Sequence, residues 1–266
     1  MRIGIIGARG FIGKYFTDRY IQQGQEVDAI TRDNLDISSY RAVSDWVKDR
    51  QPDVIINCVI TGGGANASDV DRSIVQSNIS IFQNFYNTVG VKRYINIGSG
   101  AEFDRTKNLS NVNEHNIFSV IPTESYGYSK NVIARMCKER TDFYTLRLFG
   151  CCHHSESSQR ILKKVSEQLL TPLTIHDKHF DMFNLEDFAR VVDYYLVEGS
   201  IKDINCVYPT KEKLLPIVKR FVKMHSIETK IVNGPVAFDY TGSGRLLESL
   251  NLPLLGLDEG LKKYYE

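Results

Sequence analysis

Residues 3–13, IGIIGARGFIG, decide the fold class of this chain. An apolar run leads into glycines at Gly7, Gly10 and Gly13, and an amphipathic stretch follows. Gly7 permits a tight turn, Gly10 lets the backbone approach a pyrophosphate, and Gly13 allows a helix to pack closely on a strand. The helix would offer free N–H groups and its positive dipole end to phosphates. The stretch predicts a dinucleotide-binding turn, with a plain glycine-rich connection as the alternative.

Apolar segments alternate with amphipathic segments through the first 150 residues. The pattern predicts strands at 3–6, 27–31, 54–59, 93–97 and 143–148, and helices at 11–23, 39–49, 71–89 and 129–139. Strands that alternate with helices pair in parallel through right-handed crossovers. We therefore expect an α/β fold, a Rossmann-type doubly wound parallel sheet over residues 1–150. Residues 151–266 would form mainly a small C-terminal substrate-binding lobe, interleaved with the first domain.

The composition indicates which kinds of partner the protein has and in which cell compartment it works. The 266 residues carry 33 basic and 32 acidic side chains, a net charge of +1, which does not indicate a nucleic-acid partner. No segment near the N-terminus is long enough to be a secretory signal or a membrane span, and the five cysteines are an odd number. We predict reduced thiols, a cytoplasmic protein and no membrane partner. Cys151, Cys152, His153 and His154 have the residue types of a zinc site, but four consecutive side chains diverge, so we predict no metal.

The residues after the second predicted strand indicate which dinucleotide binds. NAD sites usually end this strand with an acidic residue for the ribose 2′-hydroxyl, whereas Thr31 and Arg32 stand here. With Arg9 in the glycine turn, two guanidinium groups near the adenine ribose would suit a 2′-phosphate. Asp28 is an acidic alternative that lies three residues early, and Arg32 could instead be a solvated surface charge. We predict NADP as the cofactor.

Tyr126 and Lys130, in the sequence YGYSK, form the predicted catalytic pair. Their spacing places both on one face of a helix, whereas Tyr128 lies on the other side. A nearby ammonium lowers the pKa of a phenol, which helps Tyr126 to exchange a proton with a substrate oxygen while hydride moves. Ser99 follows the fourth predicted strand, at the edge where ligands bind open α/β sheets, and could hydrogen-bond the substrate carbonyl. Taken singly, each of these residues could be a chance occurrence.

The glycine turn, Ser99, Tyr126 and Lys130, in this order, resemble the extended short-chain dehydrogenase/reductase family, the NAD-dependent epimerase/dehydratase group. The stretches 31–36 and 39–43 look most like the GDP-L-fucose synthase-like sugar-nucleotide reductases of that family. The resemblance maps Ser99, Tyr126 and Lys130 onto the family's catalytic triad. The expected NADP-binding residues are Gly7, Arg9, Gly10, Phe11, Ile12, Gly13, Thr31, Arg32, Asp36, Ile37, Cys58, Val59, Ile60 and Lys130.

The resemblance extends into the C-terminal part and to the oligomeric state. Residues 180–183, with Asp187 heading a helix, look like the family's substrate-lobe segment. Helices at 71–89 and 126–139 match those that form a four-helix interface in the family, which implies a homodimer. Apolar residues at helical spacing on the first of these helices would either enter that interface or pack on the sheet: Ile74, Ile81, Phe82 and Phe85.

Departures from the family pattern bear on the reaction. The epimerising cysteine and histidine of fucose synthases correspond to Ala101 and, loosely, Arg160, neither of which can exchange a proton with carbon. His153 or His154 could restore such a group. Gly150 stands where the family usually has an asparagine after the fifth strand.

Three functions are compatible with these residues. The leading hypothesis is an NADPH-dependent reductase of a 4-keto (6-deoxy) sugar nucleotide, which would be the partner of the site. The second is an epimerase or dehydratase with tightly bound NAD, although the Asp-Glu pair of dehydratases is missing after Ser99. The third is a non-catalytic NADP-binding regulator, which would not need the Tyr126 and Lys130 pair.

Overall fold

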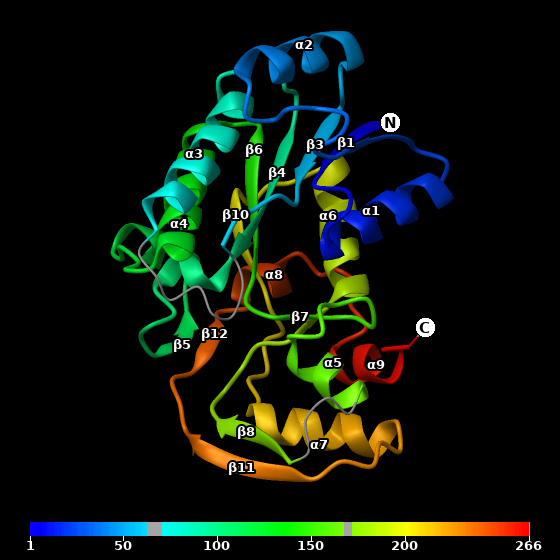
Figure 1. The fold of residues 1–266 in the computed structure, drawn as a ribbon, viewed down its shortest axis with the longest axis vertical. Coiled ribbons are helices and arrows are strands. Elements are labelled where there is room, and N and C mark those ends of the chain that lie inside the picture. Colours follow the sequence, from blue (N-terminus) through cyan, green and yellow to red (C-terminus); the bar gives the residue numbers. More distant parts are fainter. Residues whose placement is uncertain (63–70, 168–171, 266) are drawn as a thin grey trace.

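The computed structural model describes residues 1–62, 71–167 and 172–265, and its centre is a six-stranded sheet (Figure 1). The strand order is β10-β6-β4-β3-β1-β2, and every pairing is parallel. The strands are β1 (Arg2–Ile6), β2 (Glu26–Ile30), β3 (Val54–Asn57), β4 (Tyr94–Ser99), β6 (Phe143–Leu148) and β10 (Asp203–Cys206). The chain moves outward from β1 to β2 and then returns to β3 on the other side of β1. This order confirms the predicted doubly wound fold and places a topological switch point between β1 and β3.

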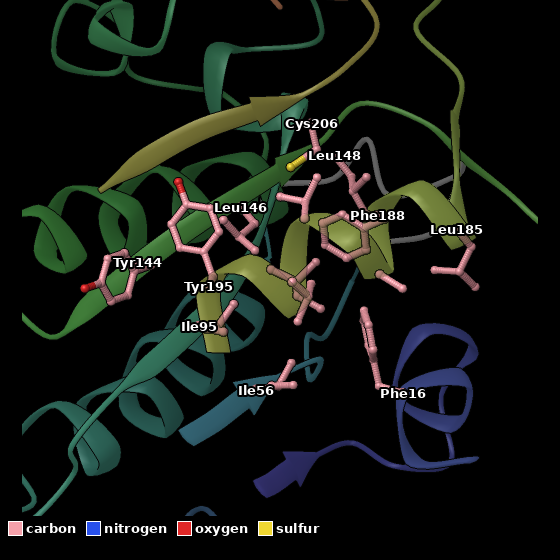
Figure 2. Packing of buried hydrophobic residues seen from close by; sticks show 14 of the residues in the cluster. Phe16, Ile56, Ile95, Tyr144, Leu146, Leu148, Leu185, Phe188, Tyr195 and Cys206 are labelled. Atoms are coloured by element: carbon pink, nitrogen blue, oxygen red, sulfur yellow. The ribbon is translucent and has the colours of Figure 1, made fainter. Parts of the chain in front are cut away.

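Helices cover both faces of this sheet (Figure 1). One face carries α1 (Phe11–Gln22) and α6 (Leu185–Val197), and the other carries α2 (Tyr40–Arg50), α3 (Arg72–Tyr86) and α4 (Ser125–Glu139). Alternate residues of one strand therefore enter different cores: Ile56 of β3 packs with α1 and α6, while Ile55 packs with α2 and α3. Figure 2 shows Phe16 of α1 and Phe188 of α6 directed at the strands. Because of this double cover, nearly every side chain of β3, β4 and β6 is buried.

A smaller lobe lies below the sheet in Figure 1. It contains β8 (Leu173–Asp177), β11 (Ile231–Val236), α5 (Ile161–Ser166), α7 (Leu214–Met224) and α9 (Leu257–Lys262), which share a third hydrophobic core. Short elements join the two parts: η1 (Gly100–Phe103), β5 (Leu109–Val112), η2 (Glu114–Phe118), β7 (Cys151–Cys152), β9 (Phe183–Asn184), β12 (Tyr240–Gly242) and α8 (Arg245–Ser249). Because β10 belongs to the large sheet and α6 packs on it, the chain beyond residue 150 contributes to both parts. The predicted boundary near residue 150 itself stays a prediction.

The start of α4 differs most from the sequence prediction. The helix begins at Ser125, one turn before residue 129, where the apolar pattern predicted it, and one residue before the start at 126 that the family resemblance implied, so Tyr126 lies inside it. Gly127 disfavours a helix by its intrinsic propensity. It is required here because a Cβ at this position would lie 2.6 Å from the carbonyl oxygen of Ala101. Tertiary packing of α4 on η1 thus overrides local propensity.

Among the described residues, no helix is both long and apolar enough to cross a membrane.

Phe188→Ala is expected to lower the free energy of unfolding by about 3–5 kcal/mol, because truncating a buried aromatic ring leaves a cavity. Phe188 has no exposed surface, and its ring centroid lies 5.9 Å from that of Phe16. Urea denaturation of Val197→Ala provides the control, since Val197 ends the same helix with 71% of its surface exposed. Equal losses in the two variants would contradict this account of the core.

Candidate active site

The glycine turn between β1 and α1 has the shape that a phosphate group needs. Gly7 has a φ of +83°, which favours glycine, and its carbonyl oxygen accepts the Gly10 N–H at 2.9 Å. A Cβ at Gly13 would overlap the Gly7 carbonyl, so only glycine lets α1 approach the turn this closely. Gly10 is the N-cap of α1 and has no side chain to cover the helix end. The N–H groups of the first helical turn, which begins with Phe11, Ile12 and Gly13, therefore remain available to an anion.

The loop after β3 lies against this turn. The Cys58 N–H donates to the Ile6 carbonyl at 3.0 Å, and a Cβ at Gly7 would meet the Val59 side chain at 2.8 Å. Cys58, Val59 and Ile60 are all half-buried. The structure thus brings Cys58 and Val59 to the switch point, and their contact with a cofactor stays a prediction.

The loop after β2 carries the residues that were predicted to select the cofactor. Thr31 follows β2 directly, and its N–H donates to Asn34 Oδ1 at 2.8 Å. Arg32 and Arg9 are exposed, and Arg9 forms an ion pair with Asp33. This pairing places Arg9 and the loop after β2 next to each other at the surface.

Two further predictions concern the flanks of this loop. Asp28, the acidic alternative, lies on β2 with both carboxylate oxygens bonded to Arg50 Nε, at 3.0 and 2.9 Å. Asp36 is exposed and accepts the Ser38 hydroxyl at 2.6 Å, which lowers the pKa of its carboxyl group. The Ile37 carbonyl accepts a hydrogen bond from the Asn84 side chain at 2.9 Å, which ties the loop to α3.

Ser99, Tyr126 and Lys130 converge at the carboxyl end of β4. Ser99 is the last residue of β4, and its hydroxyl lies near the phenol of Tyr126, where it acts to lower the pKa of that phenol. Lys130 lies one turn further along α4, and its Nζ donates to the Ile97 carbonyl at 2.5 Å. Parallel strands end at the same edge of a sheet, so this group faces the same side as the glycine turn. The arrangement can place a phenol, an ammonium and a hydroxyl around one carbonyl oxygen.

The electrostatics of Tyr126 differ from the sequence expectation. Desolvation raises the pKa of Tyr126 above its ordinary value, while Ser99, Arg105 and Arg160 act in the opposite direction. Lys130, whose own pKa is lowered by desolvation, donates to a backbone carbonyl. The expectation that the pKa of Tyr126 is lowered is therefore wrong, because burial outweighs the nearby positive charges.

Sequence reasoning missed two residues of this group. Tyr240 of β12 lies near the Ser99 hydroxyl, which acts to lower the pKa of its phenol, and its ring centroid lies 5.1 Å from that of Phe149. The Arg105 guanidinium lies 5.5 Å from the centroid of the Tyr126 ring and is held by Glu124 at 2.8 Å. Both contacts join segments that are distant in sequence or follow no local spacing, so no motif marks them.

The small lobe explains why glycine stands at position 150. A Cβ there would lie 2.6 Å from both the Asp181 carbonyl oxygen and the Phe180 ring, so the asparagine usual in the family does not fit this backbone. Asp187 holds the C-terminal segment, since its carboxylate accepts the Leu255 N–H at 2.7 Å. The segment from 180 to 187 therefore packs the two parts together.

The Cys151 to His154 run lies between the phosphate turn and the small lobe. Both cysteines are buried in β7, and the His153 ring centroid lies 5.2 Å from that of Tyr15 on α1. Burial lowers the pKa of His153 to about 4, so the ring is neutral at neutral pH. In the described part of the chain, no cluster of three or more His, Cys, Asp or Glu side chains could hold a metal ion. Arg160 reaches toward the site, with its guanidinium 5.8 Å from the centroid of the Phe11 ring.

A parallel doubly wound sheet with a glycine turn at its switch point defines a Rossmann-type dinucleotide-binding protein. The sequence model of the NAD dependent epimerase/dehydratase family matches residues 3–205, and the chain belongs to this family. No curated protein matches the sequence significantly.

Solved structures of sugar-nucleotide enzymes share this fold. The dTDP-4-dehydrorhamnose reductase of Bacillus anthracis strain Ames, in complex with NADP, has a TM-score of 0.84 at 15% identity, covering 99% of this chain and 97% of that one. A GDP-L-fucose synthetase of Naegleria fowleri bound to NADP has a TM-score of 0.79 at 13% identity, covering 99% and 91%. The dTDP-glucose 4,6-dehydratase of B. anthracis strain Ames, in complex with NAD, has a TM-score of 0.80 at 14% identity, covering 99% and 95%. The shared fold therefore accommodates both reductases and a dehydratase.

Proposed function

We propose that the protein is an NADPH-dependent oxidoreductase that reduces the keto group of a 4-keto (6-deoxy) sugar nucleotide. The observation that carries the proposal is the convergence of Ser99, Tyr126 and Lys130 at the edge of the sheet that also holds the glycine turn. The NADP in the related reductase and fucose synthetase structures supports this cofactor.

The residues around the switch point would hold the cofactor. The first turn of α1 would bind its pyrophosphate, and Arg9 and Arg32 its 2′-phosphate. Asp36 and Ile37 would lie beside the adenine, with Cys58, Val59 and Ile60 along the loop after β3. When bound, NADPH supplies the hydride for the keto carbon.

Tyr126 would protonate the keto oxygen, and Ser99 would orient that oxygen by a hydrogen bond. Lys130 would hold the nicotinamide ribose and stabilise the phenolate left after proton transfer. The raised pKa of Tyr126 supports reduction, because the phenol keeps its proton at neutral pH and can act as the acid.

The alternatives find less support in the site. An epimerase must exchange a proton with carbon, and Ala101 and Arg160 offer no such group. A dehydratase needs free acid and base groups, but Glu102, the acidic residue nearest to Ser99 in sequence, is buried against Arg147. A non-catalytic regulator would not require the Tyr126 and Lys130 arrangement.

We also place the protein in the cytoplasm. Its five cysteines are free thiols, and all but Cys58 are buried. Unpaired thiols are typical of reducing compartments.

Tyr126→Phe is expected to lower kcat by about 10²–10⁴-fold, the usual contribution of a general acid. The assay is NADPH oxidation with a panel of 4-keto sugar nucleotides that differ in the base. NADPH binding, followed by fluorescence, should persist, and Tyr128→Phe should keep wild-type activity because its ring is on the exposed side of α4. Full activity in Tyr126→Phe would refute the mechanism.

Arg32→Asp is expected to shift the ratio of kcat/KM for NADPH over NADH toward NADH by about tenfold or more, since a charge-assisted hydrogen bond contributes roughly 1.5–3 kcal/mol. Arg41→Asp is the matched control, because Arg41 is an exposed arginine on the neighbouring helix α2. An unchanged ratio in Arg32→Asp would count against NADP selection by this loop.

We propose that a second copy of this chain covers the face formed by α3 and the residues before α4. Ile121 is 69% exposed there and lines a depression with Val75 and Tyr128. Phe82 and Phe85 instead pack inward on the sheet, so they do not contribute to this face. A homodimer would bury the exposed apolar side chains.

Ile121→Glu is expected to shift the protein from dimer to monomer in sedimentation velocity, because it would bury an unpaired charge in the interface. Ile21→Glu on α1, at an exposed site on the opposite face of the sheet, should leave the dimer intact. A wild-type protein that sediments as a monomer at all concentrations would contradict the proposal.

A further inference from the structure

A buried ion cluster lies beside the active site and is not used in the mechanism above. The Arg147 side chain of β6 and the Glu102 side chain of η1 have no exposed surface, and Arg147 Nε lies 2.5 Å from Glu102 Oε2. Arg147 Nη2 lies 2.8 Å from Asp203 Oδ1, and Nη1 donates to Asn205 at 3.0 Å. Lys138 completes the cluster, 2.9 Å from Asp203. Buried ion pairs often contribute little net stability compared with apolar side chains, so stability alone does not explain this cluster.

Glu102 connects the cluster to the catalytic turn through its second oxygen. Glu102 Oε1 accepts the Ser99 N–H at 2.8 Å, while the Ser99 hydroxyl accepts the Ala101 N–H at 3.2 Å. The two interactions fix the backbone that presents the Ser99 hydroxyl. The Glu102 carbonyl also accepts the Asn131 side chain at 2.8 Å, which ties this turn to α4 next to Lys130.

The carboxylate and the Lys130 ammonium lie at the same strand end. A Cβ at Gly98 would meet Glu102 Oε1 at 2.7 Å, so the carboxylate packs directly on this residue. Lys130 Nζ binds the carbonyl of Ile97, the residue immediately before Gly98. Both charges are buried, and a low dielectric strengthens their attraction.

We propose that Glu102 is a positioning residue of the reaction: its carboxylate, held by Arg147, fixes the turn that presents Ser99 and sets a negative charge beside Lys130 and Tyr126. The proposal rests on the proposed function. Glu102 itself touches neither the substrate nor the cofactor in this account and acts through the three catalytic residues.

The Glu102 carboxylate shifts the pKa of Lys130 and the pKa of Tyr126 in the same direction. The negative charge of Glu102 raises the pKa of Lys130 and that of Tyr126. Lys130 otherwise faces the thiols of Cys58 and Cys137, whose pKa burial raises to about 12. Tyr126 otherwise faces the cations Arg105 and Arg160 and the phenol Tyr240. Reduction needs both Lys130 and Tyr126 protonated. Removal of the Glu102 charge would lower the pKa of both groups, so activity would decline at a lower alkaline pH.

Glu102→Gln is the primary test, because it removes the charge and preserves the size of the side chain. We expect kcat to fall about tenfold, a part of the effect of a general acid, with little change in KM for NADPH. The alkaline limb of the kcat profile should move to lower pH. Asp203→Asn is the matched control, since Asp203 contacts the same guanidinium without contacting Ser99 or Lys130; its pH profile should match the wild type. An unmoved alkaline limb in Glu102→Gln, or an equal shift in Asp203→Asn, would overturn the proposal.

Two further measurements keep the test decisive. If Glu102→Gln fails to fold, Glu102→Gln/Arg147→Met removes both partners, so that Arg147 is not left with an uncompensated charge, and the same shift of the limb is expected. Amide hydrogen exchange of Ser99 in the wild-type protein needs no substrate. We expect a protected Ser99 N–H, and unprotected exchange would overturn the proposal even if no nucleotide sugar is turned over. A protected amide together with no reduction of any keto sugar nucleotide would instead count against the proposed function alone.

Discussion

The contact between α4 and the 3-10 helix η1 is the constraint on which the site depends. Gly127 lets the backbone of α4 approach Ala101 so closely that a Cβ would lie 2.6 Å from its carbonyl oxygen. This approach carries Tyr126, one residue before, and Lys130, one turn after, to the end of β4. A larger residue at position 127 would push the helix away from Ser99. The geometry of the proposed catalytic group, Ser99, Tyr126 and Lys130, therefore depends on the absence of a side chain at Gly127.

The same end of β4 concentrates buried charge. The sheet and α4 shield Lys130 and Glu102 from water. Arg147, on the neighbouring strand β6, neutralises the charge of Glu102 in an ion pair. Charges in such surroundings interact strongly, but each must have a partner. The glycine turn differs from this buried region, because it offers neutral backbone N–H groups, rather than charges, at an exposed helix end. The candidate site thus combines a neutral glycine turn at its proposed cofactor end with buried, paired charges beside Ser99 and Lys130.

The sequence predicted the sheet and the cofactor turn because their signals are local. Glycine spacing, apolar runs and helical periodicity each act within a few residues, and the observed strands β1, β2, β3, β4 and β6 follow them closely, whereas β10 at the edge of the sheet was not predicted. The apolar pattern alone started α4 one turn late, at residue 129, because packing on Ala101 outweighs the low helix propensity of Gly127. Tyr240 and Arg105 could not be predicted, because they reach Ser99 and Tyr126 through the folded arrangement of β12 and the loop after η1. The direction of the Tyr126 pKa was wrong for a related reason, since desolvation depends on the whole surrounding structure.

If the proposed site is correct, one bound dinucleotide extends from the glycine turn to Tyr126 and Lys130, and a crystal structure of the protein with NADP would show it. We expect the pyrophosphate at the first turn of α1, the 2′-phosphate between Arg9 and Arg32, and the nicotinamide ribose hydrogen-bonded to Lys130, with the nicotinamide facing Tyr126. A dinucleotide bound with its nicotinamide turned away from Tyr126, or at another surface, would contradict it.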